Sequence, residues 1–276
     1  MIRGCGDILG LMAEPMTVAI DAARAAGRHL LEGVEGAPTG IDAKSSHTDL
    51  VSDADRESET AIVSAIRWAF PEDAIVAEEG SLESGGSGRT WYIDPLDGTI
   101  NYLYGVPHWS VVICLADAQG ALAGVVYDPV RDELFGAERG AGAWVSRGGG
   151  APRPLRTTAV TDLGRALVAT GFAYVAADRE EQARILTRVL GQVRDLRRYG
   201  SAALDLSWVG AGRFDAYFES VDKPWDWMAG ALIVREAGGR VTELPQARSG
   251  HPHIVASAPD VHDALVALLN RAVQPG

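Results

Sequence analysis

The sequence predicts a mixed α+β protein whose second half belongs to the α/β class. Between residues 110 and 146, short apolar runs are separated by turn residues, a pattern typical of an antiparallel meander. From about residue 166 onward, helical and strand patterns alternate, which predicts an α/β arrangement. The 276 residues are 47% hydrophobic and 22% charged, as in ordinary folded proteins. This composition excludes a disordered or fibrous protein.

The N-terminal part is expected to be helical up to the first strand. Residues 17–31 are alanine-rich with helical spacing, and residues 54–69 repeat small side chains on one helix face until Pro71 ends the pattern. The segment 73–79 then predicts a short strand that finishes in two glutamates. Residues 1–15 are expected to form an N-terminal extension outside the fold.

The later elements follow from the same patterns. A strand near 90–93 precedes the meander, and a glycine- and proline-rich stretch at 146–154 predicts a boundary between halves 16–150 and 151–276. The second half is expected to contain these elements in order: strand 166–170, helix 178–190, strand 194–198, helix 201–209, strand 213–218, helix 226–237, strands 240–243 and 253–256, and helix 259–271.

Composition also restricts the setting and the partners. No apolar run reaches the roughly 18 residues that a membrane span needs, and the N-terminus lacks a signal-peptide cleavage site. Two lone cysteines, Cys5 and Cys114, fit a reducing compartment, so we expect a cytoplasmic protein without membrane contacts. The formal net charge of −12 disfavours nucleic acid as a partner and favours cations.

One short stretch, "WYIDPLDGTINY" at residues 91–102, concentrates the chemistry. Asp94 and Asp97 flank Pro95, a spacing that suits a tight turn as well as a metal site, and these residues alone leave both interpretations open. The pair follows an apolar strand, where α/β folds place ligands. Gly98 and Thr99 then predict a helix start, whose N–H groups attract anions such as phosphate.

Other acidic residues are candidates for the same site. Glu78 and Glu79 end the strand before the motif, and Asp226 in "KPWDWMAG" opens a helix. Taken singly, the glutamates are ordinary solvated residues at a strand end and Asp226 is an ordinary helix cap. Magnesium needs only a few converging oxygen ligands, so together these residues could form its site.

Taken together, four blocks resemble one family. The blocks "KSSHTDLVSDAD" (44–55), "AEE" (77–79), "WYIDPLDGTINY" (91–102) and "PWDWMAG" (224–230) are similar, in this order, to motifs of the inositol monophosphatase family. These are magnesium-dependent phosphatases of the lithium-sensitive type, and the resemblance covers about residues 16–271. It implies a layered αβαβα sandwich and a homodimer.

The resemblance also implies roles for individual residues. Magnesium would be bound by Glu78, Asp94, Asp97, Asp226 and the backbone carbonyl of Leu96. Phosphate would be bound by Gly98 and Thr99. Thr99 would hydrogen-bond Asp55, and this pair together with Glu78 would orient a metal-activated water for attack on phosphorus. Lys44 and Asp49 match a lysine and an aspartate of the family's preceding loop. Without the resemblance, Asp55 is an ordinary first-turn helix charge and Lys44 an ordinary solvated lysine.

The sequence indicates the substrate less directly than it indicates the metal and phosphate residues. The segment "RRYGSAALDLSWVGAGRFDAYFE" (197–219) resembles the bacterial inositol-1-monophosphatase branch. This implies that Gly200, Ser201 and Ala202 line a sugar pocket, that Asp97 also meets substrate, and that Glu219 accepts inositol hydroxyls. Met228 departs from the small residue common in the family and is expected to alter the floor below the metals. The expected substrate is a small phosphate monoester, inositol monophosphate.

Several other functions remain open. Histidinol phosphate, fructose 1,6-bisphosphate or a nucleotide 3′-phosphate would use the same metal residues with a different pocket. A non-catalytic regulatory protein of the same fold is the alternative from another class. The intact acidic set argues against it, because a scaffold has no physical need for these carboxylates.

Overall fold

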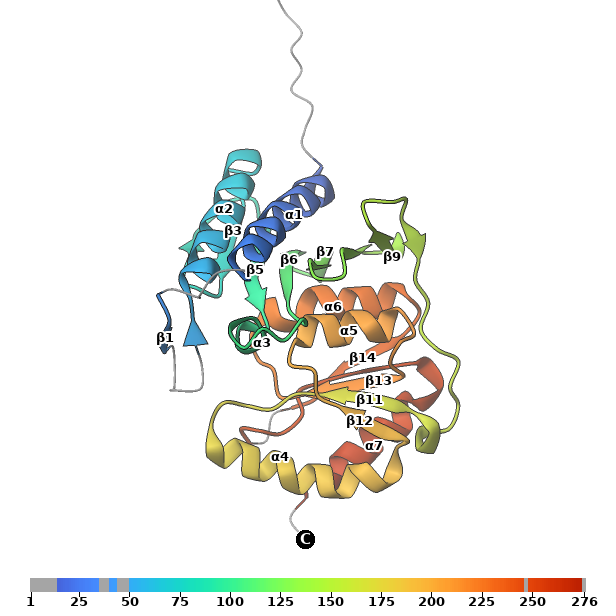
Figure 1. Cartoon of the computed structure of the whole chain (residues 1–276). Helices are drawn as coiled ribbons and strands as arrows, with labels where there is room; N and C mark the ends of the chain where they lie inside the picture. Colours follow the sequence, from blue (N-terminus) through green and yellow to red (C-terminus); the bar gives the residue numbers. More distant parts are fainter. Residues whose placement is uncertain (1–13, 35–39, 44–49, 246–247, 275–276) are drawn as a thin grey trace, which may run out of the picture.

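Layers of helices and sheets alternate in the computed structural model of the protein, which describes residues 14–34, 40–43, 50–245 and 248–274 (Figure 1). Helices α1 (Pro15–Val34) and α2 (Asp53–Ala69) form the first layer and cover an eight-stranded sheet. Helices α5 (Ala202–Gly210) and α6 (Pro224–Glu236) lie between that sheet and a five-stranded sheet. Helices α4 (Ala176–Val189) and α7 (His262–Ala272) cover the far side. The predicted αβαβα sandwich is confirmed.

The larger sheet contains the predicted meander. Its strand order is β10-β9-β8-β7-β6-β5-β3-β4. The bounds are β3 Ala74–Ala77, β4 Leu82–Glu83, β5 Thr90–Asp97, β6 Ser110–Asp117, β7 Gly120–Asp128, β8 Glu133–Glu138, β9 Gly142–Arg147 and β10 Arg153–Pro154. Its strands pair antiparallel except for β3 and β5, which run parallel. Parallel strands end at the same edge of a sheet, so the residues after β3 and those at the end of β5 come together.

The Asp-Pro-Leu-Asp stretch differs from the tight turn considered above. Strand β5 continues through Asp97, and its pairing with β6 shifts register between Asp94 and Asp97. Pro95 has no N–H to donate to a neighbouring strand, and it sits within this irregularity. The Leu96 N–H turns back to the Asp94 carboxylate, with 2.9 Å between nitrogen and Oδ1. The two aspartates are therefore presented by a bulged strand end.

The smaller sheet has the order β12-β11-β13-β15-β14. Its strands are β11 Leu167–Thr170, β12 Asp195–Arg197, β13 Ala216–Glu219, β14 Arg240–Glu243 and β15 Ile254–Ser257. Strand β11 pairs parallel with β12 and β13, whereas β15 pairs antiparallel with β13 and β14. The second half is thus a mixed α/β arrangement, as expected. A two-stranded ribbon, β1 (Asp42–Ala43) and β2 (Leu50–Val51), completes the sheets of the described chain.

Helix α6 passes close to the larger sheet because small residues face it. A side-chain carbon at Gly124 of β7 would lie 3.0 Å from the Ala229 Cα. A side-chain carbon at Gly230 would lie 2.6 Å from Leu206 Cβ of α5. Met228 is half-buried among core residues and does not line the cavity described below.

Some expectations fall outside the described residues: positions 1–13 of the extension expected at 1–15, Cys5, and the family positions Lys44 and Asp49. Pro15, expected in that extension, already begins α1. None of the helices in the described part of the chain combines the length and apolar character that a bilayer crossing requires. The small-residue segment 81–88 includes the short strand β4.

Candidate metal and phosphate site

Three carboxylates from three elements meet at the end of β3 and β5. Glu78 directly follows β3, and its N–H donates to the Ile93 carbonyl at 3.1 Å. Asp94 comes from β5 and Asp226 from the first turn of α6. One carboxylate oxygen of each residue lies within 4.8 Å of the others. Asp226 is not the helix N-cap, because Lys223 occupies that position and Pro224 begins the helix.

A residue of α2 binds the backbone of the loop that carries Glu78. The buried Glu59 carboxylate accepts the N–H of Glu79 at 2.7 Å and the N–H of Ser81 at 3.0 Å. Two backbone hydrogen bonds to one buried carboxylate fix the turn after β3. This role of Glu59 could not be predicted, since a glutamate inside a helical pattern carries no signal of such a contact.

The charges of this cluster are mutually unfavourable. Burial raises the pKa of Asp94 well above its usual range, and the negative charges of Glu78, Asp97 and Asp226 add to that rise. Burial likewise raises the pKa of Asp226, with further contributions from Glu78 and Asp97. A divalent cation between these oxygens would relieve the repulsion, and an all-oxygen donor set matches hard cations. The residues therefore fit a metal site.

Asp97 lies beside this group and is anchored by the start of α5. Its Oδ2 accepts the Ser201 hydroxyl at 2.6 Å and the Ala203 N–H at 2.9 Å. Burial raises the pKa of Asp97 to about 6, while these hydrogen bonds act in the opposite direction. Ser201 is itself buried as the N-cap of α5 and does not line the cavity, unlike the sequence-based expectation. Its hydroxyl orients Asp97.

Behind the carboxylates, Thr99 connects two positions expected in the site. Its Oγ1 lies 3.0 Å from the Leu96 carbonyl oxygen and 3.1 Å from Asp55 Oδ1. Asp55 is fully buried in the first turn of α2, where its other oxygen, Oδ2, accepts the Ser52 N–H at 2.9 Å. Asp55 therefore makes two contacts. Oδ2 binds at the start of α2, as expected of an acidic residue in a first helical turn, and Oδ1 contacts the Thr99 hydroxyl, as the family resemblance implies.

The predicted helix start after Asp97 is present as α3 (Thr99–Leu103), capped by Gly98. Gly98 has a φ of 95°, and a side-chain carbon there would lie 3.2 Å from the Gly200 carbonyl oxygen. Glycine is required by both the backbone conformation and this close approach. The N–H groups of a first helical turn have no partner within the helix, and Gly98 and Thr99 line the same cavity as the carboxylates.

These groups open into a cavity of about 430 Å³. Most of the residues expected in the site line it: Glu78, Asp94, Leu96, Asp97, Gly98, Thr99, Gly200, Ala202, Glu219 and Asp226. Asp55 and Ser201 lie behind this surface. Phe172, Tyr174, Arg198 and Trp225 also line the cavity, and no role was predicted for them from the sequence. For Arg198, the one signal in the sequence is its position two residues before Gly200, which was expected to line the sugar pocket.

The end of β13 presents Glu219 to the same cavity. Burial raises the pKa of Glu219 to about 7, opposed by a hydrogen bond from Tyr217 and by the positive charge of Arg198. The Tyr217 hydroxyl donates to Glu219 Oε2 at 2.9 Å. A side-chain carbon at Gly171 would lie 1.9 Å from Glu219 Oε1, so Gly171 leaves the space that this carboxylate fills.

A model of the inositol monophosphatase family matches residues 12–274. The chain belongs to this family. Nus factor SuhB of Vibrio cholerae is 41% identical over 250 residues, 88% of this chain and 91% of that protein. The inositol-1-monophosphatase of Mycobacterium bovis is 42% identical over 237 residues, 84% of this chain and 81% of that protein.

Solved structures of the inositol monophosphatase family have the same fold. The extragenic suppressor protein suhB of Bartonella henselae superposes with a TM-score of 0.83 at 35% identity, covering 95% of this chain and 98% of that one. The inositol monophosphatase of Anabaena gives a TM-score of 0.78 at 35% identity, covering 93% and 95%. Family membership supports metal-dependent phosphatase chemistry at the carboxylate cluster. The relatives' names differ, so they do not decide the substrate.

Proposed function

We propose that the protein is a magnesium-dependent phosphatase that hydrolyses inositol monophosphate to inositol and phosphate. The convergence of Glu78, Asp94 and Asp226 oxygens within 4.8 Å of one another is the observation that carries this proposal. Asp97 and the Leu96 carbonyl would complete the ligand set. Magnesium held there would neutralise phosphate charge, lower the pKa of a nearby water and stabilise the leaving oxygen.

The chain's own residues perform the remaining tasks. The N–H groups of Gly98 and Thr99 bind phosphate oxygens at the positive end of α3 and orient phosphorus for in-line attack. Thr99 donates its proton to Asp55, which leaves its lone pairs to accept a hydrogen bond from the attacking water. Glu78 accepts the other proton of that water. As the water oxygen bonds to phosphorus, the ester P–O bond breaks and the alcohol oxygen takes up a proton from solvent. Glu78 then releases to solvent the proton that it accepted.

Glu219 supports a polyol as the alcohol part. A half-buried carboxylate at the cavity wall accepts hydroxyl hydrogen bonds, and it is held there by Tyr217. Inositol offers several hydroxyl donors besides its phosphate. Histidinol phosphate, fructose 1,6-bisphosphate and nucleotide 3′-phosphates are the alternatives that share the metal residues.

The proposal also covers the cellular location of the protein and its partners. A cytoplasmic location is supported by the fully buried thiol of Cys114 and by the cysteine count of two. A homodimer is expected from the family resemblance, and the net charge of −12 opposes binding to nucleic acid.

The test is phosphate release from the four ester types, with magnesium and with a chelator. The proposal predicts the highest kcat/KM for inositol monophosphate and loss of release in chelator. A higher kcat/KM for another of these esters would identify that ester as the substrate in place of inositol monophosphate. A protein that binds magnesium and releases phosphate from none of the esters would be a regulatory member of the family.

A further inference from the structure

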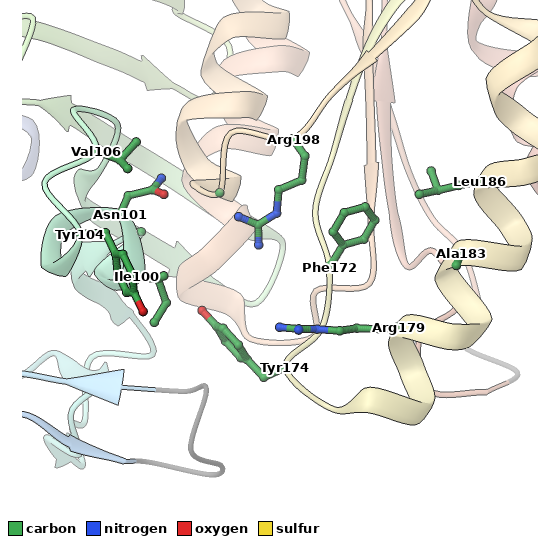
Figure 2. A pocket seen from close by; sticks show the side chains of 12 residues that line it. Ile100, Asn101, Tyr104, Val106, Phe172, Tyr174, Arg179, Ala183, Leu186 and Arg198 are labelled. Atoms are coloured by element: carbon green, nitrogen blue, oxygen red, sulfur yellow. The ribbon is translucent and has the colours of Figure 1, made fainter.

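Asn101 of α3 belongs to the motif at 91–102 and has no task in the proposed reaction. Its side-chain Nδ2 donates one hydrogen bond to the His108 carbonyl and one to the Tyr199 carbonyl, each 2.7 Å long. A primary amide has two N–H donors, so backbone acceptors use both of them. Figure 2, a view into a cavity of about 660 Å³ beside the candidate site, shows this amide directed from α3 toward the segment that carries Arg198. The amide therefore bridges three segments of the chain.

The three segments meet at Gly98. A side-chain carbon at Gly98 would lie 3.2 Å from the carbonyl oxygens of both His108 and Gly200. A side-chain carbon at Gly200 would lie 3.2 Å from Asn101 Nδ2. Gly98 and Gly200 both line the cavity of the candidate site, where the Gly98 N–H is a proposed phosphate donor. The amide bridge therefore holds together the backbone that surrounds the phosphate-binding turn.

A separate bridge holds the metal side of the site. Asp97 accepts the Ser201 hydroxyl and the Ala203 N–H, so that bridge runs from β5 to the start of α5. The Asn101 bridge starts from α3 and reaches backbone carbonyls before β6 and before α5. The two bridges share no atom. Loss of the Asn101 amide should therefore move the phosphate donors and leave the carboxylate cluster in place.

We propose that Asn101 is a positioning residue that fixes the phosphate-binding N–H groups of Gly98 and Thr99 against the segment at Gly200. Asn101 does not line the cavity of the candidate site, so it acts through the backbone and not by contact with the substrate. Helix α3 has five residues, and so short a helix is not stable without contacts to other elements. A misplacement of about 1 Å in the site can cost about 10²-fold in rate. This inference rests on the proposed phosphatase chemistry and adds a residue on which that chemistry depends.

The test uses calorimetry to measure the Kd of magnesium alone and the Kd of inorganic phosphate in the presence of magnesium. The variants are Asn101→Asp, which keeps the size of the side chain but lacks the donors, and Asn101→Ala, which lacks the donors without adding charge. Both should raise the Kd of phosphate about tenfold and leave the Kd of magnesium within about twofold of wild type. The value of kcat/KM for inositol monophosphate should fall about 10²-fold. Asn270→Ala removes the other asparagine of the chain, exposed on α7, and as the matched control should change none of these values.

An unchanged Kd of phosphate in folded Asn101→Ala would overturn the inference. Equal weakening of phosphate and magnesium binding would overturn it too, because Asn101 would then support the whole site. A loss confined to Asn101→Asp would identify the added charge as its cause and would also contradict the inference. Failure of both variants to fold would overturn it by making Asn101 a residue of the fold.

The proposed function can fail separately. If the wild type binds phosphate with magnesium but hydrolyses none of the four ester types, the phosphatase assignment is wrong, and the Kd of phosphate in the variants still decides the role of Asn101. A wild type that binds no phosphate would overturn both.

Discussion

The Thr99 hydroxyl lies 3.1 Å from Asp55 Oδ1, joining residues 44 positions apart in the sequence. The same hydroxyl lies 3.0 Å from the Leu96 carbonyl oxygen, and its single proton can serve only one acceptor well at a time. A cation on the Leu96 carbonyl would direct that proton to Asp55. The lone pairs of Thr99 would then face the attacking water.

Thr99→Val should lower kcat by about 10²- to 10⁴-fold, because it removes the hydroxyl that orients this water. Thr99→Ser keeps the hydroxyl and should retain most activity. Thr60→Val is a control, since Thr60 is exposed on the helix that carries Asp55. Steady-state phosphate release with the thermal midpoint of each variant separates lost chemistry from lost folding. A folded Thr99→Val protein with kcat within tenfold of wild type would contradict this role.

The second prediction concerns recognition of a polyol by Glu219. Glu219→Gln should raise KM for inositol 1-phosphate about tenfold, since it replaces a charged acceptor, and Tyr217→Phe should raise it about threefold by freeing that acceptor. Neither change should raise KM for p-nitrophenyl phosphate, which has no hydroxyls to recognise. Competition between the two esters in one assay directly measures the ratio of their kcat/KM values.

Tyr127→Phe is the matched control, because it removes a tyrosine hydrogen bond of 3.0 Å to Asp132 away from the cavity. Parallel losses on both esters would show that Tyr217 acts only on folding. A Glu219→Gln enzyme with unchanged preference would instead refute the polyol assignment itself. If Glu219→Gln changes the preference between the two esters and Tyr217→Phe does not, only the positioning role of Tyr217 is contradicted.

Buried His108 predicts a pH-dependent stability. Its side chain packs among the rings of Tyr199 and Trp208, and neither ring nitrogen has a hydrogen-bond partner among the described residues. Burial, reinforced by the charge of Arg131, lowers the pKa of His108 from 6.5 to about 4. The nearest carboxylate oxygen, Asp205 Oδ1, is 3.9 Å away, and burial raises the pKa of Asp205 well above its usual range. His108 is therefore neutral in the folded protein above about pH 4.

Between about pH 6.5 and 4 the unfolded chain binds a proton at His108 and the folded chain does not. The free energy of unfolding should therefore fall as pH decreases through this window, by roughly 3 kcal/mol for this residue. His108→Phe should flatten that slope in urea titrations at several pH values. His29→Gln, at an exposed histidine, should leave it unchanged. Equal slopes in wild type and His108→Phe would contradict the assignment.

The repeating patterns predicted most of the fold. Small and apolar residues at helical spacing indicated α1 and α2, which begin and end within a few residues of the expected bounds. Alternation after residue 166 indicated the second half, because local periodicity survives in almost any packing environment. The layered architecture came from the family resemblance, since layers depend on contacts between distant elements.

The contacts within the site were harder to predict. Strand β5 is bulged at Asp94 to Asp97 instead of turning, because the following β6 continues to pair with it as far as Ser110. Ser201 faces Asp97 rather than the substrate cavity because its side chain is also the cap of α5. The charge of Arg198 acts on Glu219 from another segment, and no local pattern reports such a meeting. Tyr217 lies two residues before Glu219 in β13, so the period of the strand places both side chains on one face.

The most direct measurement is magnesium-dependent phosphate release by Asp94→Asn. Asparagine retains an oxygen for the Leu96 N–H, now 2.9 Å from Asp94 Oδ1, but it removes the charge at the centre of the carboxylate cluster. We expect a loss of roughly 10³-fold or more with an unchanged or raised thermal midpoint, because electrostatic stabilisation of the reacting phosphate is lost and buried repulsion is relieved. A folded Asp94→Asn protein with activity within tenfold of wild type would contradict the assignment of this cluster as the metal centre.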